Sequence, residues 1–155
     1  MPSRPVPARK PRPAPPEMPA EPTQAGRFEQ ARRVQSMALL EDYAELIADL
    51  HATGGEARPT DIARRLGVTH ATAAKAITRL KREGLATARP YRGVFLTEAG
   101  ERLAERVKAR HLLVVDLLRA VGVPAEAAEQ DAEGIEHHVC DITLQAFAQF
   151  LKKAK

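Results

Sequence analysis

The chain has 155 residues, of which 44% are hydrophobic and 28% charged, and its formal net charge is +4. No run of about 18 apolar residues occurs, and the basic N-terminus lacks an apolar core, so we expect neither a transmembrane helix nor a secretory signal. The single cysteine, Cys140, excludes an internal disulfide and favours a reducing cytoplasm.

Residues 1–26 contain nine of the twelve prolines, mixed with Arg, Lys, Ala and Glu. A segment of this composition cannot bury an apolar core, so we predict a disordered, basic, partly polyproline tail. Its basic side chains could contact DNA phosphates, although a solvated tail is the preferred interpretation.

Three helical segments are predicted after the tail. Apolar residues recur at helical spacing over 27–51, and Gly54 follows the end of that pattern. Thr60 is expected to cap a short helix over 61–66. Thr69, after a glycine turn, is expected to cap a helix that runs to about residue 83.

A hairpin is predicted next, from two short strands over 85–89 and 93–96. Two short helices joined by a glycine turn and followed by a hairpin are typical of a winged helix-turn-helix. We therefore predict a winged helix-turn-helix DNA-binding domain over 27–97.

The second helix of this domain has an apolar face, because Ala73, Ile77 and Leu80 are spaced by four and three residues. The other face is free for a DNA groove, although a solvated basic face would look similar. Polar residues at the start of such a helix read base edges, and basic residues neutralise phosphates. The predicted DNA-contacting residues lie in this helix and at the hairpin tip: Thr69, His70, Ala71, Thr72, Lys75, Arg79, Arg89, Tyr91 and Arg92.

The sequence after the hairpin, residues 98–155, predicts further helices. Thr97 is expected to cap a long helix over 98–121, with an apolar stripe that ends at Val121. An acidic helix follows, and Asp141 opens a last one. We therefore predict a mainly α chain whose second domain, 98–155, is all helical.

The acidic helix carries a metal-binding pattern. If residues 131–138 are helical, Glu133, Glu136 and His137 lie at i, i+3 and i+4, within reach of one ion. Carboxylate and imidazole groups together suit a divalent metal.

Two further segments supply donors of the same kind. Asp42 and Glu45 share a helix face, and His111 lies on the apolar stripe of the long helix, where a histidine needs a partner. Taken singly, these residues are more often solvated charges or a core histidine. In one pocket, however, the four carboxylates of the set would repel one another, and two divalent cations would neutralise them.

At these residues the chain resembles the manganese-dependent repressors of the diphtheria-toxin-repressor (iron-dependent repressor) family. The resembling segments are Glu41-Asp42-Tyr43 with Glu45, Asp61-Ile62-Ala63, Tyr91-Arg92-Gly93, Leu96-Thr97, Arg110-His111 and Glu133-Gly134-Ile135-Glu136-His137-His138. The resemblance implies a homodimer with a helical metal-binding and dimerisation domain, and repression of manganese uptake genes through palindromic operator DNA. It also implies a binuclear centre with two Mn²⁺ per subunit, held by Asp42, Glu45, His111, Glu133, Glu136 and His137.

The metal preference can be read at two positions. Iron-responsive members of the family carry methionine at the position of Asp42 and cysteine at that of Glu133. Oxygen donors suit manganese better than sulfur donors do. Cys140 is interpreted as a packed core thiol. The alternatives are an iron- or zinc-responsive repressor, a winged-helix sensor of an organic ligand, and a di-metal hydrolase; we expect a regulator and not an enzyme.

Overall fold

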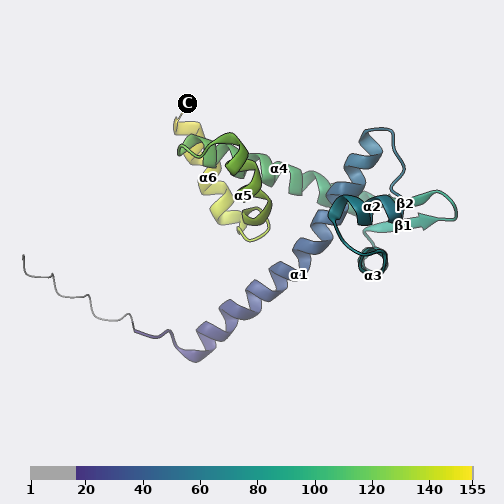
Figure 1. The fold of residues 1–155 in the computed structure, drawn as a ribbon. Coiled ribbons are helices and arrows are strands. Elements are labelled where there is room, and N and C mark those ends of the chain that lie inside the picture. Colours follow the sequence, from purple (N-terminus) through teal and green to yellow (C-terminus); the bar gives the residue numbers. More distant parts are fainter. Residues whose placement is uncertain (1–16, 155) are drawn as a thin grey trace, which may run out of the picture.

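The computed structural model describes residues 17–154, which form a mainly helical chain with one two-stranded sheet (Figure 1). The predicted fold class is confirmed. Most of the predicted proline-rich tail, residues 1–16, lies outside the described residues. The elements in chain order are α1 (Glu21–Ala52), α2 (Pro59–Leu66), α3 (His70–Arg82), β1 (Ala86–Arg89), β2 (Gly93–Leu96), α4 (Glu98–Ala120), α5 (Ala125–Ile135) and α6 (Asp141–Ala154).

Helix α1 is longer than the sequence pattern predicted, because it begins at Glu21 and not near residue 27. The prediction of a disordered tail is therefore wrong for residues 21–26. Pro22 is compatible with a helix there, since its missing N–H falls in the first turn, where it has no intrahelical partner. The N-terminal half of α1 projects away from the other helices in Figure 1.

The start of α2 also differs from the prediction. The helix begins at Pro59 with Arg58 as its N-cap, and not at residue 61 with Thr60 as the cap. Proline at the first helical position has a fixed φ that suits a helix. The cap of α3 is as predicted, since the Thr69 hydroxyl accepts a hydrogen bond from the Thr72 N–H at 3.1 Å.

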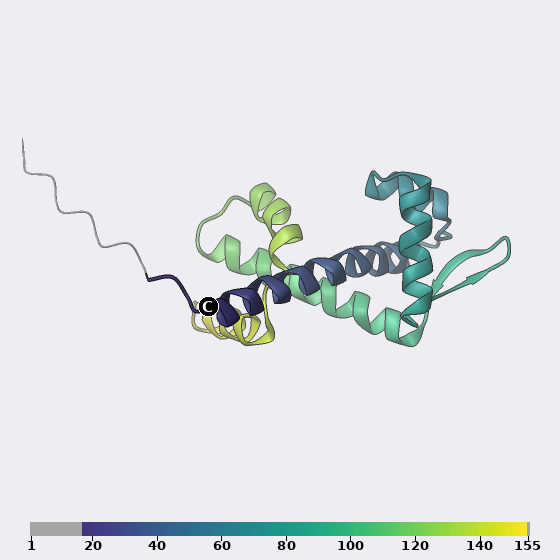
Figure 2. The ribbon, with the colours of Figure 1, turned by 90° about the horizontal axis from the view of Figure 1, so that it is seen from below.

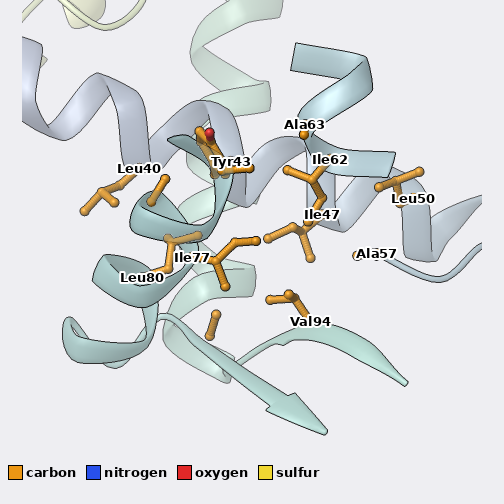
Figure 3. Close-up of a cluster of buried hydrophobic side chains, with 13 residues drawn as sticks. Leu40, Tyr43, Ile47, Leu50, Ala57, Ile62, Ala63, Ile77, Leu80 and Val94 are labelled. Carbon is orange, nitrogen blue, oxygen red and sulfur yellow. The ribbon is translucent and has the colours of Figure 1, made fainter. Parts of the chain in front are cut away.

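The hairpin is antiparallel and is fixed to the segment before α2. Ala86 pairs with Leu96, and the Val94 N–H donates a hydrogen bond to the carbonyl of Ala57 at 2.9 Å. Side chains of α1, α2, α3 and β2 then form one core, which includes Tyr43, Ile62, Leu80 and Val94 (Figure 3). The C-terminal half of α1 is therefore part of the winged helix-turn-helix.

Helix α4 joins this domain to the C-terminal helices, which lie at its other end (Figure 2). Its N-terminal part packs on α1 through Ala44, Leu103 and Val107. Its C-terminal part packs on α5 and α6 through a second cluster that includes Val114. The predicted apolar stripe stops short of Val121, which is 62% exposed just after the helix ends. Among residues 17–154, no helix is long and hydrophobic enough to cross a bilayer.

Gly100 gives a test of the contact between α4 and the hairpin. A Cβ at this buried position would overlap the carbonyl oxygen of Leu85, which is backbone and cannot swing away. Gly100→Ala is expected to cost about 3 kcal/mol of unfolding free energy, at the upper end of overpacking effects. Gly134→Ala is the control, since nothing lies within 4 Å of its Cβ position. Equal urea midpoints for the two variants would contradict the described contact.

Candidate metal centre

The metal-binding pattern lies where α5 ends. The helix stops at Ile135, so the condition that residues 131–138 are helical is met only as far as Ile135. Glu136 keeps helical backbone angles and its N–H still donates to Ala132, but His137 lies in a turn. The His138 ring lies 2.9 Å from the Gly134 carbonyl and is exposed. Glu133 and Glu136 thus share a helix face, whereas His137 is placed by the turn.

One group of donors surrounds His111 of α4. Its Nδ1 lies 2.6 Å from Glu136 Oε2 and 3.7 Å from Glu133 Oε1. One donor atom from each of these three residues falls within 4.8 Å of the other two. On the other side of the ring, His111 Nε2 lies 2.9 Å from Glu129 Oε2.

A second group surrounds His137 and reaches α1. His137 Nε2 lies 2.8 Å from Asp42 Oδ1 and 3.5 Å from Glu136 Oε1. His137 Nδ1 lies 2.7 Å from Glu41 Oε2, and Glu41 Oε1 lies 2.7 Å from the Arg110 guanidinium. Glu136 lies between the two groups, because its two oxygens face the two histidines.

Glu45, the sixth predicted ligand, lines a hollow together with Asp42 and Glu133. Burial raises the pKa of Glu45, and the nearby Glu133 carboxylate raises it further. The structure thus brings together all six side chains that the sequence singled out, from α1, α4, α5 and the turn after α5.

Burial controls the ionisation of Glu136. Its side chain is fully buried, which raises the pKa to about 7, although His111 and His137 favour the charged form. Burial opposes the charge on His137 too, but the nearby carboxylates of Asp42 and Glu41 outweigh it and raise the pKa of His137 to about 10. Burial would raise the pKa of Glu41, yet His137 and Arg110 lower it.

The donor atoms fit a divalent cation. Glu136 Oε1 and His137 Nε2 are buried and have no hydrogen-bond partner among the described residues. With a proton on Nδ1 facing Glu41, a neutral His137 presents the Nε2 lone pair toward Asp42 and Glu136. Metal-binding histidines commonly have their other ring nitrogen held by a carboxylate in this way. The carboxylate oxygens of this set suit manganese, whereas its imidazole nitrogens also suit iron and zinc.

Three residues of this site were missed as functional residues by the sequence reasoning: Glu41, Arg110 and Glu129. Glu41 and Arg110 were quoted only as part of family segments. Glu129 precedes Glu133 by four residues, so helical spacing could have placed it on the same face. Cys140, in contrast, is exposed, with its Sγ 3.5 Å from Thr143 Oγ1, so its interpretation as a packed core thiol is wrong.

The face of α3 predicted to read DNA is open to solvent. His70, Ala71, Thr72 and Lys75 are exposed. Thr69 lies there as well, but its hydroxyl is occupied with the helix cap and lies 2.9 Å from the Thr72 hydroxyl.

Arg79 differs from the others, because its guanidinium donates to the carbonyl and the hydroxyl of Ser36 on α1, each at 2.9 Å. In the hairpin, Tyr91 is fully exposed at the tip with a φ of 62°, and Arg92 is exposed beside it. The Arg89 guanidinium lies 5.3 Å from the centre of the Phe95 ring. All of these residues stay predicted DNA contacts.

Two family models match most of the described chain, from residue 36 onward. Residues 36–94 match the N-terminal DNA-binding domain of the iron-dependent repressors, and residues 97–155 match their metal-binding and dimerisation domain. The chain belongs to the iron-dependent repressor family.

Relatives and solved structures agree with this assignment. The transcriptional regulator MntR of Escherichia coli O6:H1 is 48% identical over 126 residues, which cover 81% of each chain. The structure of the manganese regulator SloR has a TM-score of 0.66 at 26% identity, over 73% of this chain and 53% of that one. A manganese-dependent transcriptional repressor in complex with manganese has a TM-score of 0.64 at 27% identity, over 73% and 52%. The chain thus spans about half the length of these two solved proteins.

Membership of this family decides whether the chain is a regulator or an enzyme. Its members are transcriptional repressors and not enzymes, so the expectation of a regulator is confirmed and the hydrolase alternative is not supported. The DNA-binding model covers the winged helix-turn-helix as far as the start of β2, and the metal-binding and dimerisation model covers α4, α5 and α6.

Glu129 gives a test of how the repressor's metal centre is supported. Because Glu129 holds Nε2 of His111, Glu129→Gln is expected to weaken Mn²⁺ binding about tenfold. This is the lower end of the effect of removing a carboxylate that orients a metal-binding histidine, because the Glu129 side chain is 62% exposed and water can replace it. Competition titration against a fluorescent metal indicator measures this. Glu126→Gln, in the first turn of the same helix, is the control. Unchanged affinity in Glu129→Gln would show that the carboxylate does not orient His111.

Proposed function

We propose that this chain is a manganese(II)-responsive repressor that binds operator DNA as a homodimer in the cytoplasm and represses manganese uptake genes. The observation that carries the proposal is the convergence of six oxygen and nitrogen donors from α1, α4 and the end of α5 around the buried Glu136. We further propose that these residues, Asp42, Glu45, His111, Glu133, Glu136 and His137, hold two Mn²⁺ per subunit.

The donor types support manganese over iron. Asp42 and Glu133 are carboxylates at the positions where the iron-responsive members carry sulfur ligands. Cys140 is exposed and lies outside the group of converging donors. The names of the relatives point the same way, since MntR and SloR are described as a transcriptional regulator and a manganese regulator.

The position of α1 connects the metal centre with DNA binding. Asp42 and Glu45 lie on the same helix as Tyr43 and Ile47, which belong to the core of the winged helix-turn-helix. A bound cation would neutralise the carboxylates and hold α1 to α4 and α5. Any change in how α1 lies on α4 must therefore move α3, which presents the predicted DNA-reading face.

The C-terminal half supports the dimer. Four large apolar side chains there are exposed in the single chain: Leu112, Val121, Ile142 and Phe150. A dimer that buries such side chains would present two α3 helices to a palindromic operator. The half-sites of such an operator lie about 34 Å apart, which is one helical turn of DNA.

The proposal is tested by fluorescence anisotropy on a labelled manganese-transporter promoter, with Mn²⁺, Fe²⁺, Zn²⁺ or a chelator. Mn²⁺ is expected to tighten binding at least tenfold over the chelated protein, and electron paramagnetic resonance to count two Mn²⁺ per subunit. Operator binding that survives the chelator unchanged would indicate an organic-ligand sensor. A response to Fe²⁺ or Zn²⁺ but not to Mn²⁺ would place the chain with the alternative metals.

A further inference from the structure

A basic hollow lies beside the C-terminal end of α3, and Arg79 is the only residue predicted to contact DNA among those that line it. It is lined by α1 and by the end of α3: Glu29, Arg32, Arg33, Ser36, Met37 and Arg79. Three arginines thus meet around a single carboxylate, so the hollow has a local charge of about +2.

The arginines of α1 continue the face that packs on the DNA-binding domain. Leu40, Tyr43 and Ile47 of that face are buried in the domain core. Arg33 precedes Leu40 by seven residues, which is about two helical turns, so it lies on the same face just beyond the edge of the core. Arg32 precedes Ser36 by four residues and lies beside it. In Figure 1 the N-terminal half of α1 extends away from the DNA-binding domain.

Arg79 fixes α3 against this part of α1. Its guanidinium binds the Ser36 carbonyl and hydroxyl at 2.9 Å, which sets the hollow directly beside the C-terminal end of α3. Arg33 is paired with Glu29 at 2.6 Å on the same helix. Arg32 has no ion-pair partner among residues 17–154, so its charge is available to an outside anion.

We propose that Arg32 and Arg33 of α1 bind the phosphate backbone of operator DNA beside the segment read by α3. The inference rests on the proposed DNA binding by α3, and it adds a contact made by the N-terminal half of α1. The guanidinium group matches a phosphate with two parallel hydrogen bonds. The matched DNA-binding domain begins at residue 36, so this contact lies outside it. The contact widens the footprint on DNA without adding sequence information.

The salt dependence of operator binding tests the proposal. Each phosphate contact contributes about 0.9 to the slope of log affinity against log salt concentration. With two contacts per subunit, Arg32→Ala/Arg33→Ala is expected to lower the slope of the dimer by about 3 to 4. Raising the salt concentration from 50 to 200 mM should therefore lower the operator affinity of the double variant about 100-fold less than it lowers that of the unmodified protein. A structural role of the arginines would change affinity without changing this slope.

Arg27→Ala is the matched control, because Arg27 is exposed on the same helix and points about 140° away from Arg32. It is expected to leave the slope unchanged. Glu29→Gln is expected to have the opposite effect. It removes the carboxylate that competes with a DNA phosphate for Arg33, so operator binding should tighten severalfold at low salt.

An unchanged slope in the double variant, or an equal fall in Arg27→Ala, would overturn the α1 contact and leave the proposed function intact. If the manganese-loaded unmodified protein itself failed to bind the operator, both proposals would be overturned. Circular dichroism of the double variant checks that α1 keeps its helix.

Discussion

Glu136→Gln is expected to abolish manganese-stimulated operator binding. Glu136 is fully buried between the two histidines, with Oε2 2.6 Å from His111 Nδ1 and Oε1 3.5 Å from His137 Nε2. Glutamine has the same shape but replaces one anionic oxygen with an NH₂ group, which cannot bind a cation. The affinity for Mn²⁺ should fall by more than about 100-fold, because removal of a residue that only orients a metal ligand already lowers metal affinity about 10- to 100-fold. Calorimetric titration with Mn²⁺, beside the anisotropy assay, measures both effects.

Stability distinguishes a ligand role from a structural role of Glu136. Because burial raises the pKa of Glu136 to about 7, its charged form is disfavoured in the metal-free protein. Glu136→Gln removes that charge, so the metal-free variant should unfold at the same temperature as the unmodified protein or higher. Asp131→Asn, a change at an exposed position of α5, is expected to keep the full response to manganese. A Glu136→Gln variant that retains this response would remove Glu136 from the centre.

The affinity for manganese is expected to rise steeply with pH. His137, with a pKa of about 10, carries a proton at neutral pH in the metal-free protein, and Glu136 carries a partial one. A cation must displace both, so binding releases protons. The affinity should rise at least tenfold per pH unit between pH 7 and 8.5, where His137 releases its proton, and more steeply toward pH 6, where Glu136 releases one as well.

The metal-free protein should show the opposite trend. The folded-state pKa of His137 lies above its usual 6.5, so its charged form stabilises the fold fully below pH 6.5 and this stabilisation is lost toward pH 10. The folded-state pKa of Glu136 lies above its usual 4.5, so stability also falls as pH rises from 4.5 to about 7. Thermal melts at several pH values, with chelator or with Mn²⁺, measure both trends. A manganese affinity that is flat from pH 6 to 8.5 would contradict the protonated His137.

Local rules in the sequence predicted most of the elements. The Thr69 and Thr97 caps are found as expected, because a cap depends only on residues within one turn. The buried face of α3 was readable for the same reason, since Ala73, Ile77 and Leu80 repeat at helical spacing. The errors fall at element ends: α1 begins earlier than predicted and α5 ends at Ile135.

The sequence by itself determined which side chains could bind a metal, because donor type and spacing along a helix are local properties. The tertiary structure alone decided how these side chains are supported. Glu41 holds His137 across 96 residues of chain, and Arg79 binds Ser36 across 43. Such contacts depend on how α1 packs against α3, α4 and the end of α5. Packing between segments far apart in the chain leaves no periodic signal in the sequence, so only the folded chain shows it.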